Sequence, residues 1–290
     1  MPPTPETERW RRWAQQRLHQ PVALVPVDHP GQEARVLEVR GERGTLAYLK
    51  QHRVADKWRR EQTILALLAD PPTPVPPLLA TDSSGLLLLL GVLPGTPATR
   101  ITLSAPERRS LHEQAGRFRR RLDTIPIGAP DPTPVIAAMA RRHRAWCERA
   151  RGHLSPTVLT RVERVFDPGC FEGTTRRWCH RDLAPHNWIV EATPGGPRLG
   201  ILDFGRARPD VWLVDVLELW DRCWVDDPSL PEAFWAGYGR RPDPGESRQL
   251  QQLALLHGLA TATWGDRHRD AARSRHGRIT LHRALEALGR

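Results

Sequence analysis

Three polar residues in the middle of the sequence have the types and the spacing that magnesium-dependent phosphoryl transfer requires. Asp182 lies five positions before Asn187, and Asp203 begins an Asp-Phe-Gly triplet sixteen positions after Asn187. Asp182 would accept or orient the hydroxyl proton of the attacking group. Asn187 and Asp203 offer the hard oxygen ligands that Mg²⁺ prefers, with nucleotide phosphates and water completing the coordination. The pattern therefore predicts phosphoryl transfer.

The segment between the two predicted metal ligands has the pattern of a β-hairpin. Short apolar runs at 188–190 and 199–202 flank a Pro-Gly-Gly-Pro turn at 194–197. The hairpin would bring Asn187, at its entrance, close to Asp203, at its exit. The alternative is a chance occurrence of both motifs in an arginine-rich chain, and their order, their spacing and the hairpin argue against it.

The segment 180–215 resembles the protein-kinase-like superfamily, and within it the small-molecule branch of aminoglycoside phosphotransferases and choline kinases. The Asp-Phe-Gly triplet runs almost directly into the segment 212–216, and no Ala-Pro-Glu follows. The chain therefore has no room for the long activation segment with which a protein kinase docks a peptide. The resemblance implies that Asp215 is a structural anchor beneath the catalytic loop.

The resemblance also implies an α+β, protein-kinase-like fold with two lobes. A nucleotide-binding N-lobe with a small antiparallel sheet would occupy 1–93, and a mostly helical C-lobe with the catalytic loop, metal loop and acceptor site would occupy 94–290. The patterns along the chain agree with this division. Strands are predicted at 21–27, 34–39, 45–50, 78–81 and 86–92, and helices at 54–68, 104–122, 135–152, 156–166, 212–225, 231–238, 246–263 and 270–288.

Nucleotide contacts are predicted from five positions of the N-lobe. Lys50 closes the third strand, where kinases place the lysine that neutralises the α and β phosphates, and it is one of two lysines in a chain with 43 Lys and Arg residues. By the same resemblance Glu61 holds Lys50, with a surface glutamate as the alternative. Backbone groups of Leu90, Gly91 and Val92 would bind the adenine edge. The predicted cofactors are Mg²⁺ and ATP or GTP.

Two further features of the predicted N-lobe concern phosphate binding and the core. The first hairpin has only Pro-Gly-Gln-Glu at 30–33 in place of a Gly-rich phosphate loop, so the sequence does not show how the phosphates are held. Near the start of the chain, Trp10, Trp13, Ala14 and Leu18 make one apolar stripe on a predicted helix. We interpret this stripe as part of the core.

The segment 215–232 is acidic and carries interleaved tryptophans, which suggests the acceptor site. Asp221, Asp226 and Asp227 would favour a cationic acceptor, and Trp224 would offer a flat wall. The alternative is that these tryptophans fill the core of the helical lobe and that the acids form a solvated face.

Composition excludes several other classes of protein. The formal net charge is +10, but the arginines are spread along many helices without a nucleic-acid-binding motif, so nucleic acid is not expected as a partner. No segment resembles a membrane span or a secretory signal, and the four cysteines lack metal-ligand spacing. We therefore expect a cytoplasmic monomer or homodimer with reduced thiols.

These observations predict a small-molecule kinase that transfers the γ-phosphate of ATP or GTP to a hydroxyl of a small acceptor. The first hypothesis is an antibiotic O-phosphotransferase that gives resistance or self-protection. The alternatives are a metabolic kinase for choline, homoserine, a thiosugar or a similar alcohol and, from another class, a catalytically inactive nucleotide-binding module.

Overall fold

The computed structural model describes residues 4–27, 34–70, 73–128 and 131–289, which group into two compact units. The first unit comprises Met1–Gln114 and Ala184–Arg208, and the second comprises Ala115–Leu183 and Pro209–Arg290. The predicted loop at 30–33 lies outside the described residues. The units do not follow the predicted boundary after residue 93, because the hairpin that carries Asn187 and Asp203 groups with the sheet that precedes it.

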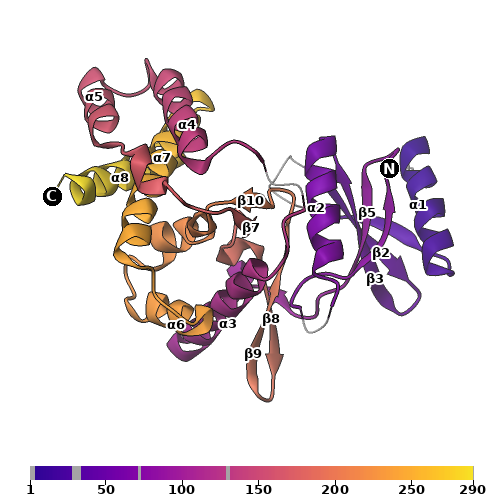
Figure 1. Ribbon diagram of the computed structural model, residues 1–290. Helices are drawn as coiled ribbons and strands as arrows, with labels where there is room; N and C mark the ends of the chain where they lie inside the picture. Colours follow the sequence, from indigo (N-terminus) through magenta and orange to yellow (C-terminus); the bar gives the residue numbers. More distant parts are fainter. Residues whose placement is uncertain (1–3, 28–33, 71–72, 129–130, 290) are drawn as a thin grey trace. The chain divides into compact units, whose positions relative to one another are not determined.

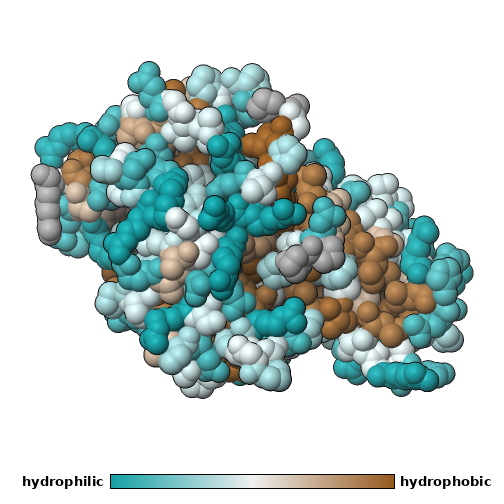
Figure 2. Space-filling view, turned by 60° about the horizontal axis from the view of Figure 1, so that its bottom comes forward, coloured by the Kyte–Doolittle hydropathy of each residue, from teal (hydrophilic) through white to brown (hydrophobic). Residues whose placement is uncertain are grey.

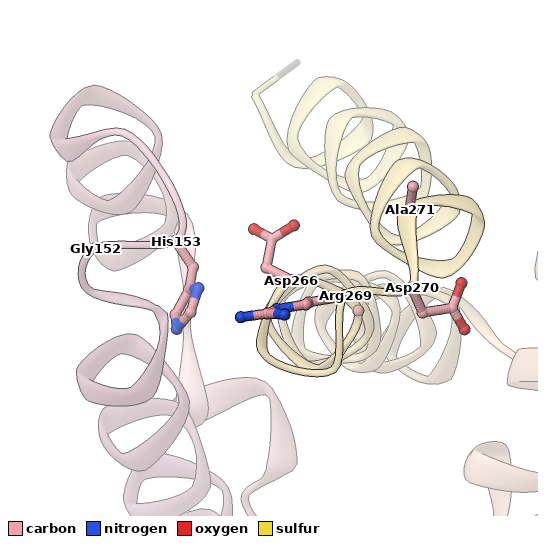
Figure 3. A pocket seen from close by; sticks show the side chains of 7 residues that line it. Gly152, His153, Asp266, Arg269, Asp270 and Ala271 are labelled. Carbon is pink, nitrogen blue, oxygen red and sulfur yellow. The ribbon is translucent and has the colours of Figure 1, made fainter.

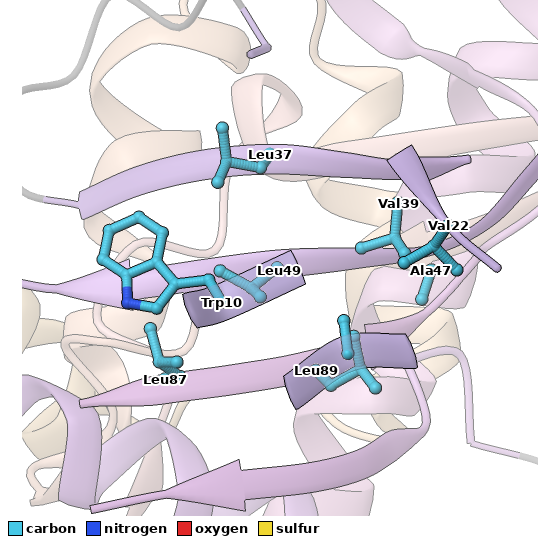
Figure 4. Packing of buried hydrophobic residues seen from close by; sticks show 9 residues of the cluster. Trp10, Val22, Leu37, Val39, Ala47, Leu49, Leu87 and Leu89 are labelled. Atoms are coloured by element: carbon cyan, nitrogen blue, oxygen red, sulfur yellow. The ribbon is translucent and has the colours of Figure 1, made fainter. Parts of the chain in front are cut away.

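The first unit contains a five-stranded antiparallel sheet in the order β1-β2-β3-β5-β4. Its strands are β1 (Ala23–Pro26), β2 (Ala34–Gly41), β3 (Gly44–His52), β4 (Leu78–Asp82) and β5 (Leu87–Gly91). Helix α1 (Pro5–Leu18) contributes the stripe predicted to be core, and Trp10 and Ala14 pack with Leu37, Leu49 and Leu87 of the sheet (Figure 4).

The alternation of side chains along β3 separates the core from the chemistry. Ala47 and Leu49 belong to the cluster around α1, so Lys50 and His52 point to the opposite face of the sheet. Helix α2 (Ala55–Leu67) contacts β3, β4 and β5, and it carries the buried Glu61. The strand therefore presents Lys50 to an acid on α2.

The predicted hairpin is formed by β8 (Trp188–Thr193) and β9 (Gly196–Ile201). Strand β6 (Thr96–Pro97) pairs with β8 and completes a three-stranded sheet. Gly95, with φ of 118°, precedes β6, and a Cβ there would lie 2.4 Å from the carbonyl oxygen of Val190. Glycine is needed at this close approach. The backbone N–H of Leu202 donates to the carbonyl of Asn187 at 2.8 Å, so the two ends of the hairpin adjoin.

The second unit is mostly helical, as predicted (Figure 1). Helix α3 (Ala105–Asp123) runs into it from the first unit, and its other elements are α4 (Val135–Ala150), α5 (Pro156–Val165), β7 (Arg177–Cys179), β10 (Arg208–Asp210), α6 (Ser229–Tyr238), α7 (Pro244–Arg267) and α8 (Ala271–Leu288). Helices α7 and α8 pack closely because Gly258 and Gly277 face the partner backbone; a Cβ on Gly277 would lie 2.2 Å from the nitrogen of Ala262. The α+β class expected from the sequence is confirmed.

One predicted helix differs. The segment 212–225 is not a continuous α-helix but a 3₁₀ turn, η4 (Trp212–Asp215), followed by a one-turn π-helix, η5 (Leu219–Cys223). Carboxylates in each part bind groups far away in sequence, as described below, and such tertiary anchors override the regular helical repeat.

The surface and the thiols agree with the sequence interpretation. Hydrophilic residues spread over much of the face drawn in Figure 2, with smaller hydrophobic areas among them. All four cysteines are free thiols. Within the described part of the chain, no helix combines the length and the apolar character needed to cross a membrane.

Candidate active site

An ion-pair cluster in the first unit joins three of the residues predicted to bind nucleotide. The Nζ atom of Lys50 lies 2.7 Å from Oε2 of Glu61 and 2.8 Å from Oδ1 of Asp203. The Lys50 and Glu61 side chains are 10% and 2% exposed, whereas that of Asp203 is 43% exposed. Glu61 therefore holds Lys50 from the buried side, and Asp203 contacts Lys50 from a side chain that is partly exposed to solvent.

Burial and charge act in opposite directions on this cluster. Burial disfavours the charged form of Lys50, but the carboxylates of Glu61 and Asp203 outweigh it, so the pKa of Lys50 is raised. Burial likewise opposes the ionisation of Glu61, but Lys50 and His52 outweigh it and lower the pKa of Glu61. The stabilising contribution of Glu61 is thus present above its unfolded-state pKa of about 4.3. It is lost as the pH falls through the lower folded-state pKa.

His52 is a member of this cluster that the sequence interpretation missed. Its Nε2 atom lies 2.7 Å from Oε2 of Glu61, and its side chain is 2% exposed. The signal was present, because residues two apart on a strand share a face and Lys50 lies at that distance. On the other side of Glu61, the N–H of Phe204 donates to Oε1 at 3.4 Å, which ties the Asp-Phe-Gly turn to α2.

The Lys50–Glu61 pair gives a first testable prediction. The Lys50→Met variant should lose about 3 kcal/mol or more of unfolding free energy, because the buried carboxylate of Glu61 loses its main counter-charge. The double variant Lys50→Met, Glu61→Leu should recover most of that loss, since it removes both buried charges. Urea unfolding of the two variants and the wild type measures this. A double variant as unstable as the single one would contradict an ion-pair origin of the loss.

The hairpin determines the positions of Asn187 and Asp203, the predicted metal ligands. Asn187 is 8% exposed and ends a 3₁₀ turn, Pro185–Asn187, directly before β8. Asp203 follows β9 with a φ of 63°, a left-handed conformation that few residues other than glycine, asparagine and aspartate adopt. An amide oxygen and a carboxylate are a donor set that suits Mg²⁺, which usually takes one or two protein ligands and fills the rest with phosphates and water.

The predicted adenine contact falls at the end of β5. Leu90 is buried and Val92 is 39% exposed. The N–H of Gly91 donates to the carbonyl of Pro77 at 2.7 Å. This donor is therefore committed to the sheet, and an adenine edge would have to bind other backbone groups between Leu90 and Val92.

The predicted base, Asp182, lies in the second unit on a loop whose backbone is hydrogen-bonded to Asp215. The loop follows β7, and the N–H groups of His180 and Arg181 donate to the two carboxylate oxygens of Asp215 at 3.1 and 2.6 Å. Asp182 itself is half-buried. The structural role expected for Asp215 is confirmed by these bonds.

A buried arginine completes the anchor, and nothing in the sequence pointed to it. The guanidinium of Arg119 lies 2.7 Å from Oδ2 of Asp215, and both side chains are fully buried. Arg119 also pairs with Asp123, whose Oδ2 accepts the hydroxyl of Tyr238 at 2.8 Å. Burial opposes the charge of Arg119, but Asp215, Cys179 and Asp123 together outweigh it and keep the pKa of Arg119 raised. The anchor residue Asp215 is thus itself neutralised and held.

The predicted acceptor residues are not equally available. Oδ2 of Asp221 lies 2.6 Å from Nε2 of His276, and this aspartate is 3% exposed. Asp227 accepts the N–H of Ser229 at the start of α6. Asp226 is exposed, and Trp224 is 9% exposed. Their role in acceptor binding stays a prediction.

Two cavities lie in the second unit. The first, of about 410 Å³, lies beside the α7–α8 turn, and Figure 3 shows the His153 ring facing the guanidinium of Arg269 across it. Asp266 in its wall is already paired with Arg278 at 2.6 Å. The second, of about 350 Å³, lies against η5 and includes Trp220, Trp224 and Trp235.

Solved structures similar to this chain include antibiotic phosphotransferases. An aminoglycoside phosphotransferase in complex with GDP and kanamycin superposes with a TM-score of 0.74 at 16% sequence identity, covering 96% of this chain and 99% of that one. An ADP-bound aminoglycoside phosphotransferase gives 0.66 at 15% identity, covering 95% of each chain. The macrolide 2′-phosphotransferase of Brachybacterium faecium gives 0.59 at 18% identity, covering 94% and 97%.

These likenesses confirm the protein-kinase-like fold expected from the sequence. No curated protein sequence matches the chain. The model of the phosphotransferase enzyme family, however, matches residues 25–250, which include most of the sheet, the ion-pair cluster, the catalytic loop and the hairpin. The chain belongs to the phosphotransferase enzyme family.

Proposed function

We propose that the protein transfers the γ-phosphate of ATP or GTP to a hydroxyl of a small-molecule antibiotic. The observation that carries the proposal is the buried Lys50–Glu61 pair with Asp203 beside it, because a lysine held in this way is a phosphate-binding group poised next to a metal-ligand carboxylate. Similar structures contain GDP with kanamycin, gentamicin, or ADP, and another is a macrolide 2′-phosphotransferase without ligand. These likenesses support a nucleotide as donor and an antibiotic as acceptor.

Each of the predicted residues has one task in this reaction. Lys50 neutralises the α and β phosphates, and Glu61 keeps its ammonium group in place. Asn187 and Asp203 would hold Mg²⁺, which screens the phosphate charge when bound. Asp182 accepts the proton of the acceptor hydroxyl, and the loop that carries it is held by Asp215.

Nucleotide consumption in the presence of candidate acceptors tests the proposal. The purified protein is mixed with ATP or GTP and magnesium, and with kanamycin, gentamicin, a macrolide, choline or homoserine in turn. Phosphorylation of an antibiotic, identified by mass spectrometry, supports the proposal. Phosphorylation of choline or homoserine alone would favour a metabolic kinase. Nucleotide binding without turnover of any acceptor would favour an inactive module.

We place the reaction in the cytoplasm, where nucleotide is abundant.

A further inference from the structure

The cavity against η5 has the lining of a site for apolar rings. Three prolines, Val225 and Leu250 accompany the tryptophans in its wall, and among the described lining residues the charged one is Arg283. Trp224 and Trp235 are 9% exposed, and their ring centroids are 5.4 Å apart in an edge-to-face arrangement. Mutual packing of this kind fixes the aromatic walls before any ligand arrives.

Three acids of the segment 215–232 are already paired within the protein. Asp221 accepts from Thr280 at 2.6 Å and lies 2.6 Å from His276, and Glu218 lies 3.1 Å from Arg222. Glu232 is paired with Arg241. A ligand with several ammonium groups would therefore have to displace internal partners to reach most of these carboxylates.

Arg283 also occupies the ring face that a cationic ligand would use. Its guanidinium carbon lies 4.5 Å from the centroid of Trp220, and Nη1 lies 3.6 Å from Oδ1 of Asp221. The cation–π position on Trp220 is thus filled from α8. A further cation would be repelled by Arg283 and would lose water on entering apolar walls.

The chain connects this cavity closely to the catalytic loop within the second unit. Trp220 lies five residues after Asp215, and its backbone N–H donates to the carbonyl of Val216, the residue that follows Asp215, at 2.8 Å. A second connection runs through aromatic rings. The ring of Trp235 lies edge to face with that of Trp212, with centroids 6.3 Å apart, and Trp212 stacks on Tyr238 with centroids 4.6 Å apart. The hydroxyl of Tyr238 donates to Asp123, and Asp123 pairs with Arg119 of the anchor.

From this geometry we infer that the tryptophan cavity binds an apolar, ring-bearing part of the acceptor. The acceptor is then a hydroxyl compound with a large apolar face and at most one positive charge. The acidity of the segment 215–232 predicts a cationic acceptor, and the lining of the cavity adds the apolar face and limits the number of charges. This inference rests on the proposed function, because it assigns the acceptor of the same reaction. A macrocyclic lactone that carries one amino sugar has the required chemistry.

Trp220→Ala tests the inference, with erythromycin and rifampicin as probes and kanamycin as the polycationic comparison. Loss of one wall should raise KM for the phosphorylated probe about tenfold or more and change kcat and the KM for nucleotide little, since the ring contributes to binding in the ground and transition states alike. Trp146→Ala is the matched control, because Trp146 is also half-buried beneath an arginine, Arg149 at 5.1 Å, and lies outside the cavity.

A second variant covers the case in which Trp220→Ala folds poorly. Val225 is 52% exposed in the wall, so Val225→Asn replaces apolar surface by an uncharged polar group without disturbing a buried contact, and it should weaken erythromycin binding while leaving the thermal midpoint unchanged. Calorimetry measures probe binding directly. Turnover of kanamycin in preference to both probes, or equal KM values in Trp220→Ala and Trp146→Ala, would overturn the inference and leave the proposed function standing.

Absence of turnover with every acceptor would instead contradict the proposed function. In that case, calorimetry with the probes still shows whether the cavity is a binding site. Binding that Trp220→Ala weakens and Trp146→Ala does not would support the site, and binding of neither probe would remove it.

Discussion

Replacing Asp182 by asparagine is expected to lower kcat by about 10²- to 10⁴-fold, the range that a general base typically contributes. Nucleotide affinity should stay nearly unchanged, because the residues proposed to hold nucleotide are those of the Lys50 cluster in the first unit. Asparagine keeps the size and polarity of the side chain, so the loop bonds from His180 and Arg181 to Asp215 should persist. Steady-state kinetics with the acceptor and calorimetry with nucleotide measure the two quantities separately.

A charge control accompanies this variant. Glu163→Gln removes one exposed carboxylate from α5 in the same unit, and its kcat should equal that of the wild type. An Asp182→Asn protein that retains more than about a tenth of the wild-type kcat would rule out a base or orienting role.

Replacing Asp203 by asparagine is expected to remove the magnesium-dependent part of nucleotide affinity. The change should be at least the 10- to 100-fold that even outer-shell groups contribute to metal sites, since the carboxylate carries the main protein charge offered to the metal. Asparagine is preferred to alanine here because the φ of 63° at this position is tolerated by Asn and strains Ala. Calorimetric titration of nucleotide with and without Mg²⁺ gives the measurement.

The neighbouring lysine provides the internal check for this variant. Lys50 loses one carboxylate partner in Asp203→Asn but keeps Glu61, so the protein should remain folded with a modest loss of stability. Equal nucleotide affinity and an unchanged magnesium dependence would rule out Asp203 as a metal ligand and would favour an inactive nucleotide-binding module.

Local sequence patterns predicted most of the fold, because the strands, helices and turns that position the site residues have short periodic or turn-forming sequences. The alternation of side chains along β3 determines that Lys50 faces away from the α1 core, and the turn residues at 194–197 determine the hairpin that joins Asn187 to Asp203. The stripe of α1 was predicted as core and is confirmed as core by the burial of Trp10 and Ala14.

The remainder depended on contacts between distant residues, which a periodic pattern does not contain. Arg119 gave no signal in the sequence, because an arginine in the middle of a helix is ordinary and only its fold partner, Asp215, makes it a buried counter-charge. The partners of Asp221 gave no signal for the same reason, because His276 and Thr280 lie more than fifty residues after it, on α8.

The rarity of lysine gives the buried ion pair a practical use. The chain has two lysines, of which Lys57 is partly exposed and Lys50 is buried. An acylating reagent attacks the neutral amine, and the raised pKa of Lys50 keeps that amine as ammonium while burial excludes the reagent. Acylation at this position would therefore record how often the β3–α2 region opens, with Lys57 on the same peptide segment as the fast internal reference and almost no competing amines.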